Sequence, residues 1–316
     1  MTRKRLLRFA LAFLVIYALG TAIAWWRWGW RGVESLTTDA STVLIEPILD
    51  WSGHDHRYGL VGGESYALHL SPPAGTTGEL LFLGAKHTRD PASPQVEELR
   101  RRWGEFRPTV ALVESRLGLF FGGADAGVRQ FGEPGAAYAL ARAAGVPIYS
   151  LEPSHQDEVR VLTQRFAPEH VLMFYAMRAF GSELKAGRVT DPDPHFMALL
   201  RKRADAPQLQ GLFASAADVD RYWKEHYPAL PDWRTAPEWP EGSPQHDMFF
   251  VSNLVRDEHA ARVIVELVRR GERVFAVSGL SHTIKQEPAI RALLPGFTDG
   301  PFASPRPWEA PQPPPN

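Results

Sequence analysis

Two histidines in this chain follow the same local pattern, in which an apolar run ends at a glycine three residues before the histidine. Gly84 precedes His87 in this way, and Gly279 precedes His282. Short apolar runs bounded by glycine are typical of buried strands in a parallel sheet. Each imidazole is therefore expected just beyond the carboxyl end of a strand, where open α/β sheets place their ligand sites.

Two further apolar runs end in carboxylates. Residues 109–113 lead into Glu114, which is followed by Arg116, and residues 146–151 lead into Glu152. Imidazole and carboxylate groups together can bind a divalent metal ion, or act as acid and base at a carbonyl. Because the carboxyl ends of parallel strands meet at one edge of a sheet, we expect these side chains to converge with the two histidines.

Structural roles compete with these chemical ones. A carboxylate directly after an apolar strand is costly unless it is paired or used, which favours a functional Glu114 over a mere partner of Arg116. Arg116 either orients Glu114 or binds substrate, and plain ion pairing is equally open. Glu152 either takes part in catalysis or only caps the next helix. For His87 and His282, the repetition of the pattern favours function over a surface role.

With these motifs the chain resembles the TraB/PrgY and Tiki superfamily and, more distantly, erythromycin-esterase-like and ChaN-like proteins. Members share two Gly-x-x-His motifs, a glutamate after the second strand and an arginine late in the chain. His87 and His282 match the motifs, Glu114 matches the glutamate, and Arg256 is the candidate arginine, within a resemblance that covers roughly 80–294. Some members are metal-dependent proteases, and others are assigned to pheromone control, esterase chemistry or haem binding. The resemblance therefore implies a site more firmly than a reaction.

The composition excludes several kinds of chemistry. The 316 residues carry a formal net charge of −1, without a basic block beyond the N-terminus, which argues against nucleic acid as a partner. The chain has no cysteine, so disulfides, thiolate metal sites and cysteine nucleophiles are excluded. Any metal would have nitrogen and oxygen ligands only, which suits Zn, Mn, Co or Fe without choosing among them.

The N-terminus has the pattern of a membrane anchor. A basic stretch is followed by residues 9–26, which carry no charge and would form a helix about 27 Å long, close to the thickness of the hydrocarbon core. We therefore expect residues 1–31 to cross the cytoplasmic membrane once, with the rest outside it, in the periplasm if the source is Gram-negative. A signal peptide cleaved after Ala22-Ile23-Ala24 is the alternative, but the apolar run is long and continues into tryptophans.

Residues 32–300 are predicted to form one α/β domain, with a mainly parallel central sheet flanked by helices. A mainly helical insertion over the carboxyl edge of the sheet is expected at about 154–247, with irregular structure from 181 onwards. Residues 301–316 are rich in proline and are predicted to be a disordered tail.

The function that these patterns favour is metal-dependent hydrolysis of a peptide or ester bond in a peptide or small-molecule substrate. In this interpretation His87 and His282 bind the ion, and Glu114 is either the third ligand or the base on bound water. Arg256 or Arg116 would stabilise the oxyanion.

The alternative is a protein of the same fold that binds and sequesters a peptide or a haem without turnover. Haem would be held by a histidine and a tyrosine, and Tyr149 or Tyr175 could be the tyrosine ligand.

Overall fold

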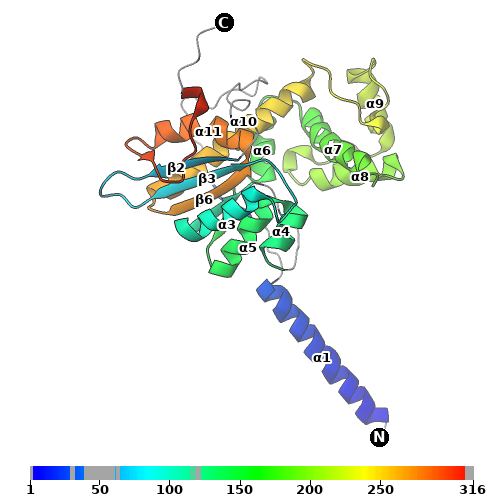
Figure 1. Ribbon diagram of the computed structural model, residues 1–316. Helices are drawn as coiled ribbons and strands as arrows, with labels where there is room; N and C mark the ends of the chain where they lie inside the picture. The colour runs from blue at the N-terminus through cyan, green and yellow to red at the C-terminus, as the bar shows by residue number, and fades with distance from the viewer. Residues whose placement is uncertain are drawn as a thin grey trace. The chain divides into compact units, whose positions relative to one another are not determined.

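The computed structural model describes residues 3–28, 33–38, 61, 65–114, 117 and 122–309, and Figure 1 shows its helices and strands. The chain divides into two compact units. The first, the sheet unit, runs to Leu151 and resumes at Ala261, and the second, the helical unit, spans Glu152–Ala260. The helical unit contains most of the residues at which the helical insertion was expected, about 154–247, and continues to Ala260.

Helix α1 comprises Arg3–Trp28 and contains the charge-free run. Its side chains are described at residue 9 and at 11–23, and all of these are exposed. Among the residues that the structure describes, no helix combines the length and the apolar character that crossing a membrane requires.

In the described part of the chain, seven strands form one sheet in the order β1-β5-β4-β6-β3-β2-β7. Neighbours from β1 to β3 in this order are parallel, whereas β2 is antiparallel to both β3 and β7. The predicted mainly parallel sheet is therefore confirmed. The strands are β1 (Glu34–Ser35), β2 (Tyr66–Ser71), β3 (Glu79–Ala85), β4 (Val110–Val113), β5 (Ile148–Ser150), β6 (Arg273–Gly279) and β7 (Thr298–Asp299).

Helices cover both faces of the sheet (Figure 1). Alternate residues of β3, β4 and β6, such as Leu81, Ala111 and Phe275, pack in one core with α3 and α5. The residues between them point to the opposite face, as strand geometry requires, and α11 contacts β2, β3 and β6 there. Burial on both faces explains why these strands are continuous apolar runs in the sequence. The helices are α3 (Pro94–Phe106), α4 (Ala124–Phe131), α5 (Glu133–Ala144) and α11 (Leu280–Leu293).

The three central strands end at the same level. Val113 of β4 lies opposite Val277 of β6, and Gly279 at the end of β6 lies opposite Ala85 at the end of β3. The ladder continues one step further, because the backbone N–H of Glu114 donates to the carbonyl of Val277 at 2.9 Å. The residues that follow these strands therefore start from one short stretch of the sheet edge.

Helices α4 and α5 approach each other at two glycines. A Cβ added at Gly127 would lie 2.3 Å from the carbonyl oxygen of Gly135, and one added at Gly135 would lie 2.2 Å from the carbonyl oxygen of Gly127. No side chain fits at either position without moving a helix. This close contact fixes the N-terminus of α5, and with it the position of Glu133.

The helical unit has its own aromatic core, which includes Phe174, Phe180, Phe196 and Trp233. The expectation of irregular structure from 181 onwards is wrong in two places, because α8 and α9 form there. Proline at the first turn of α8 starts that helix and does not break it. The elements of this unit are α6 (His155–Leu162), α7 (Pro168–Lys185), α8 (Pro192–Arg203), η1 (Pro207–Leu209), α9 (Ala216–His226), η2 (Trp233–Thr235) and the first part of α10 (Pro244–Arg269).

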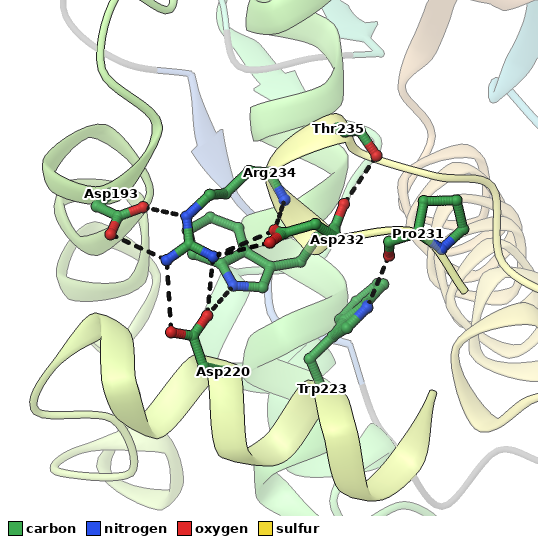
Figure 2. Close-up of polar contacts among 8 residues, drawn as sticks. Asp193, Asp220, Trp223, Pro231, Asp232, Arg234 and Thr235 are labelled. Atoms are coloured by element: carbon green, nitrogen blue, oxygen red, sulfur yellow. Dashed lines mark hydrogen bonds and ion pairs between the residues drawn. The ribbon is translucent and has the colours of Figure 1, made fainter. Parts of the chain in front are cut away.

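Arg234 ties three of these elements together, as Figure 2 shows. Its guanidinium donates to Asp193 of α8, to Asp220 of α9 and to Asp232 beside η2. It also lies 4.3 Å from the ring centroid of Trp233, whose indole N–H donates to Asp220 at 2.8 Å. One guanidinium thus donates to three carboxylates and joins segments that the core alone would leave less constrained.

The C-terminal strap, residues 300–309, is ordered against β2. Ala67 and Ser304 exchange two hydrogen bonds, of 3.0 and 2.9 Å, and the N–H of Phe302 donates to His69 Nδ1 at 3.0 Å. The prediction of a disordered tail from 301 is therefore wrong for 301–309, because backbone partners on β2 hold this proline-rich segment. Residues 310–316 lie outside the described residues.

Candidate functional site

Glu114 lies at the N-terminus of α11. Its Oε2 accepts a hydrogen bond of 2.6 Å from the N–H of Gly279, the residue that caps this helix. His282 is in the first turn of α11, and its Nε2 is 3.6 Å from Glu114 Oε1. Both side chains are 15% exposed. The partial positive charge of the helix N-terminus stabilises the Glu114 carboxylate in this half-buried position.

His87 approaches the same point from the end of β3. A Cβ added at Gly279 would lie 3.1 Å from His87 Nε2 and 3.4 Å from Glu114 Oε2. The imidazole and the carboxylate therefore both face the Cα of Gly279. The side chain of His87 is 66% exposed, so this edge is open to solvent at His87.

Steric constraints explain why glycine occurs at both positions of the repeated motif. Gly279 leaves the space into which His87 and Glu114 reach. A Cβ on Gly84 would lie 2.8 and 2.9 Å from two side-chain atoms of Thr283, in the first turn of α11. The first glycine thus lets α11 begin against β3, and the second keeps the site free of a side chain.

Glu133, the first residue of α5, supports His87 from behind. Its side chain is 1% exposed, and its Oε2 is 3.6 Å from His87 Nδ1. This distance is longer than a hydrogen bond but is within the range of an ion pair. Glu133 raises the pKa of His87, with a further contribution from Glu114, while partial burial opposes the shift. A carboxylate at Nδ1 favours the tautomer whose lone pair is on Nε2, the atom that faces Gly279.

A small network holds Glu133 and the loop that carries His87. Glu133 Oε1 accepts hydrogen bonds of 2.8 Å from the N–H of Thr88 and from Gln95 Nε2. The amide of Gln95 also bonds both the N–H and the carbonyl of Lys86. The residues on both sides of His87 are therefore fixed to α3 and α5, which restricts where the imidazole can point.

Glu133 and Gln95 were not among the residues predicted from the sequence. An acidic residue before a proline at the start of an alanine-rich helix is a common first-turn pattern, and nothing in it signals burial. The distances that reveal its role come from packing between α4 and α5, which the sequence does not display.

The predicted residues Glu152 and Arg256 form an ion pair with each other. Both belong to the helical unit, and each is 18% exposed. Glu152 does not cap α6, because the hydroxyl of Ser154 accepts the N–H of Asp157 there. Arg116 lies outside the described residues. Of the proposed haem ligands, Tyr149 lies on β5 and Tyr175 on α7.

The donor chemistry at the sheet edge suits a divalent ion. Two imidazoles, from His87 and His282, and the carboxylate of Glu114 are a nitrogen and oxygen set that Zn, Mn, Co or Fe accepts. The buried carboxylate behind His87 corresponds to the outer-shell partner of many metal-bound histidines. Within the described ranges, no group of three or more His, Asp or Glu side chains has the spacing of a formed metal site.

In comparisons with known proteins, no family model, no curated protein and no solved structure matches this chain.

Proposed function

We propose that the sheet edge is the active centre of a metal-dependent hydrolase that cleaves a peptide or ester bond, as the resemblance to the TraB/PrgY and Tiki superfamily implies. The observation that carries this proposal is the meeting of Glu114 with His282 at 3.6 Å and with His87 around Gly279. Three groups able to bind an ion or move a proton come from the ends of three adjacent strands, far apart in sequence.

Each residue has a role that its surroundings support. A divalent ion held by His87 and His282 would polarise the carbonyl and acidify a water molecule. Glu114 would act as the base that accepts a proton from water, and the N–H of Gly279 holds its carboxylate in place. Glu133 keeps the proton of His87 on Nδ1, so that Nε2 is available to the site.

Two arginines are candidates for stabilising the developing oxyanion. Arg116 is two residues after Glu114 in the sequence. Arg256 is the arginine that the family resemblance indicates, and Glu152 holds it by an ion pair. We propose both arginines as candidates, with Glu152 as the residue that orients Arg256.

The test is the substitution Glu114→Gln, which keeps the size of the side chain and removes its basicity. If Glu114 is the base, hydrolysis of a panel of fluorogenic peptides and esters should fall by roughly two to four orders of magnitude while the metal content stays unchanged. If Glu114 is a ligand, metal content should fall as well. Glu97→Gln on α3, at a carboxylate that is 77% exposed, is the matched control and should have no effect.

Full turnover in the Glu114→Gln variant would contradict the hydrolase proposal. The same purified protein gives the alternative a separate readout, since a haem-binding protein shows a Soret band and a hydrolase with a bound divalent ion does not.

We also propose that residues 1–31 tether the domain to the outer face of the cytoplasmic membrane, on the strength of the basic start and the charge-free run 9–26. The full chain should then stay with membranes after a carbonate wash, and a reporter fused to its C-terminus should be active outside the cytoplasm. Release of a shortened soluble form would show a cleaved signal peptide instead.

A further inference from the structure

A cavity of about 290 Å³ lies within the sheet unit. The C-terminal half of α10 forms most of its wall, and Thr38 after β1 and Leu293 of α11 complete it. His282 is in the first turn of α11 and Leu293 is its last residue, so about 16 Å of helix separates the two at 1.5 Å per residue. The cavity is therefore separate from the sheet edge that the hydrolase proposal uses.

One side of α10 supplies the charged part of this wall. The lining residues that belong to α10 or follow it directly are at positions 262, 265, 266, 269 and 270. Spacings of three and four residues keep them on one side of the helix. Three of these five residues are arginines, and Glu266 is the one acid among them. Guanidinium groups thus outnumber carboxylates three to one in this wall.

Arg269 brings a positive charge that no described acid contacts. Its guanidinium donates to the carbonyl oxygen of Leu293 at 2.6 Å, and a neutral acceptor of this kind does not cancel the charge. Arg270 forms an ion pair with Glu266, but the two side chains are 63% and 39% exposed, and such surface pairs contribute little. The one carboxylate of the wall therefore contacts Arg270 and not Arg269.

Thr38 and two apolar side chains complete the lining. The hydroxyl of Thr38 makes no hydrogen bond with another residue that the structure describes, so it is able to donate one to a ligand. Val265 and Leu293 add apolar surface beside the arginines. The cavity thus combines guanidinium groups and a hydroxyl with a small apolar part.

A purely structural role for Arg269 is to cap α11. Cations stabilise the last turn of a helix, where carbonyl groups are left without partners, and Arg269 contacts the carbonyl of the last residue of α11. This contact uses one of the five N–H groups of the guanidinium. A cap also gives no reason for two further arginines, Arg262 and Arg270, on the same wall.

We propose that this cavity binds a phosphate ester with a small organic group. Guanidinium groups bind phosphate oxygens through paired hydrogen bonds, and several arginines match the charge of a phosphate better than that of a carboxylate. Thr38 would donate a further hydrogen bond, and Val265 and Leu293 would contact the carbon atoms of the ester. The volume is at the lower end of the range for ligand pockets, which suits a group of the size of glycerol phosphate.

This chemistry has two possible sources, a soluble phosphate ester and the headgroup of a phospholipid. Thr38 is ten residues after Trp28, the last residue of α1, and ten residues span at most about 36 Å. The membrane tether proposed above would therefore keep the cavity near a lipid surface. The binding proposal itself depends neither on this tether nor on the hydrolase proposal.

The probe is glycerol 3-phosphate, titrated by calorimetry into the full-length protein in an uncharged detergent. EDTA is present, so that no metal ion at the sheet edge holds the phosphate. Glycerol lacks the phosphate and glycerate carries a carboxylate in its place, so each should bind at least about tenfold more weakly than glycerol 3-phosphate. Dihexanoyl phosphatidic acid, titrated in the same way, presents the same headgroup on a lipid. Tighter binding of the lipid assigns the site to a headgroup, and tighter binding of glycerol 3-phosphate assigns it to a soluble ester.

Arg269→Met keeps the apolar stem of the side chain and should weaken binding of both esters by about tenfold or more. The matched control is Arg129→Met, at an exposed arginine in the last turn of α4, and it should bind like the wild type. Thr38→Val separates binding from folding, because it keeps the shape and removes a hydroxyl without a described partner. This variant should melt at the wild-type temperature and bind the esters at least about threefold more weakly.

The proposal is overturned if the wild type binds neither ester, in which case Arg269 is only a helix cap. It is also overturned if glycerol or glycerate binds as tightly as the esters, or if ester binding is unchanged in both the Arg269→Met and the Thr38→Val variants.

Discussion

At the scale of single residues, the site depends on the absence of a side chain at Gly279 as much as on the side chains around this residue. The backbone of Gly279 has φ −60° and ψ 144°, values that any residue can adopt. Glycine is therefore required here for space and not for conformational freedom, and the N–H that donates to Glu114 could come from any residue except proline. A Cβ there would lie 3.1 Å from His87 Nε2, closer than an ordinary contact, so the imidazole packs tightly against the position of the absent methyl group.

The substitution Gly279→Ala tests this reading. The new methyl group should displace the imidazole of His87, which can rotate away because it is largely exposed. We expect a loss of stability below about 1 kcal/mol and a fall in hydrolysis of at least about tenfold. Melting temperature and turnover are measured together. Wild-type turnover in this variant would show that the space at Gly279 has no part in the reaction.

At the scale of elements, the C-terminal strap is coupled to a buried histidine of β2. His69 accepts the N–H of Phe302 at Nδ1, so its proton is on Nε2, which contacts Glu79 at 2.9 Å. Burial lowers the pKa of His69, although Glu79 opposes the shift. Protonation of Nδ1 would remove its lone pair and break the bond that holds Phe302.

This coupling predicts a loss of stability in mild acid. Below the ordinary histidine pKa of about 6.5, the unfolded chain binds a proton at His69 that the folded protein resists. The free energy of unfolding should therefore fall as the pH drops below this value, by up to about 1.4 kcal/mol per pH unit from this group. Urea unfolding between pH 7.5 and 5.5 measures the slope for the wild type and for His69→Gln.

The His69→Gln variant should be less stable than the wild type at pH 7.5, but it should lose less stability than the wild type on acidification. The difference between the two slopes isolates His69 from other histidines that titrate in the same range. Equal slopes for the two proteins would rule out a role for His69 in holding the strap at neutral pH.

At the scale of the whole molecule, the site is formed by segments that come before and after the helical unit in the sequence. Strands β3 and β4 precede it, and β6, which carries the second motif, follows it and pairs between them. Glu114 and His282 therefore meet only when β6 has entered the sheet. Such contacts between distant segments form late and cooperatively in folding, so an intact site reports a complete sheet unit.

The parts of the fold that could be predicted are those that leave a local pattern. Strands β3, β4 and β6 are visible because burial on both faces makes them apolar runs. The shorter and less buried β5 is visible as the apolar run that ends before Glu152. The strand order follows from long-range pairing, which no local pattern contains. Glu133 was missed for the same reason, since its burial depends on the contact between α4 and α5.

The central claim is that His87 and His282 act on one ion at one edge of the sheet. Metal affinity of the full-length protein, titrated with Zn and Mn for the wild type, His87→Ala, His282→Ala and the double variant, tests it most directly. Each single substitution should weaken metal binding by more than the roughly 10–100-fold that the loss of an outer-shell partner costs. The double substitution should cost much less binding free energy than the sum of the two single substitutions. Wild-type affinity in either single variant, or no binding by the wild type, would contradict the claim.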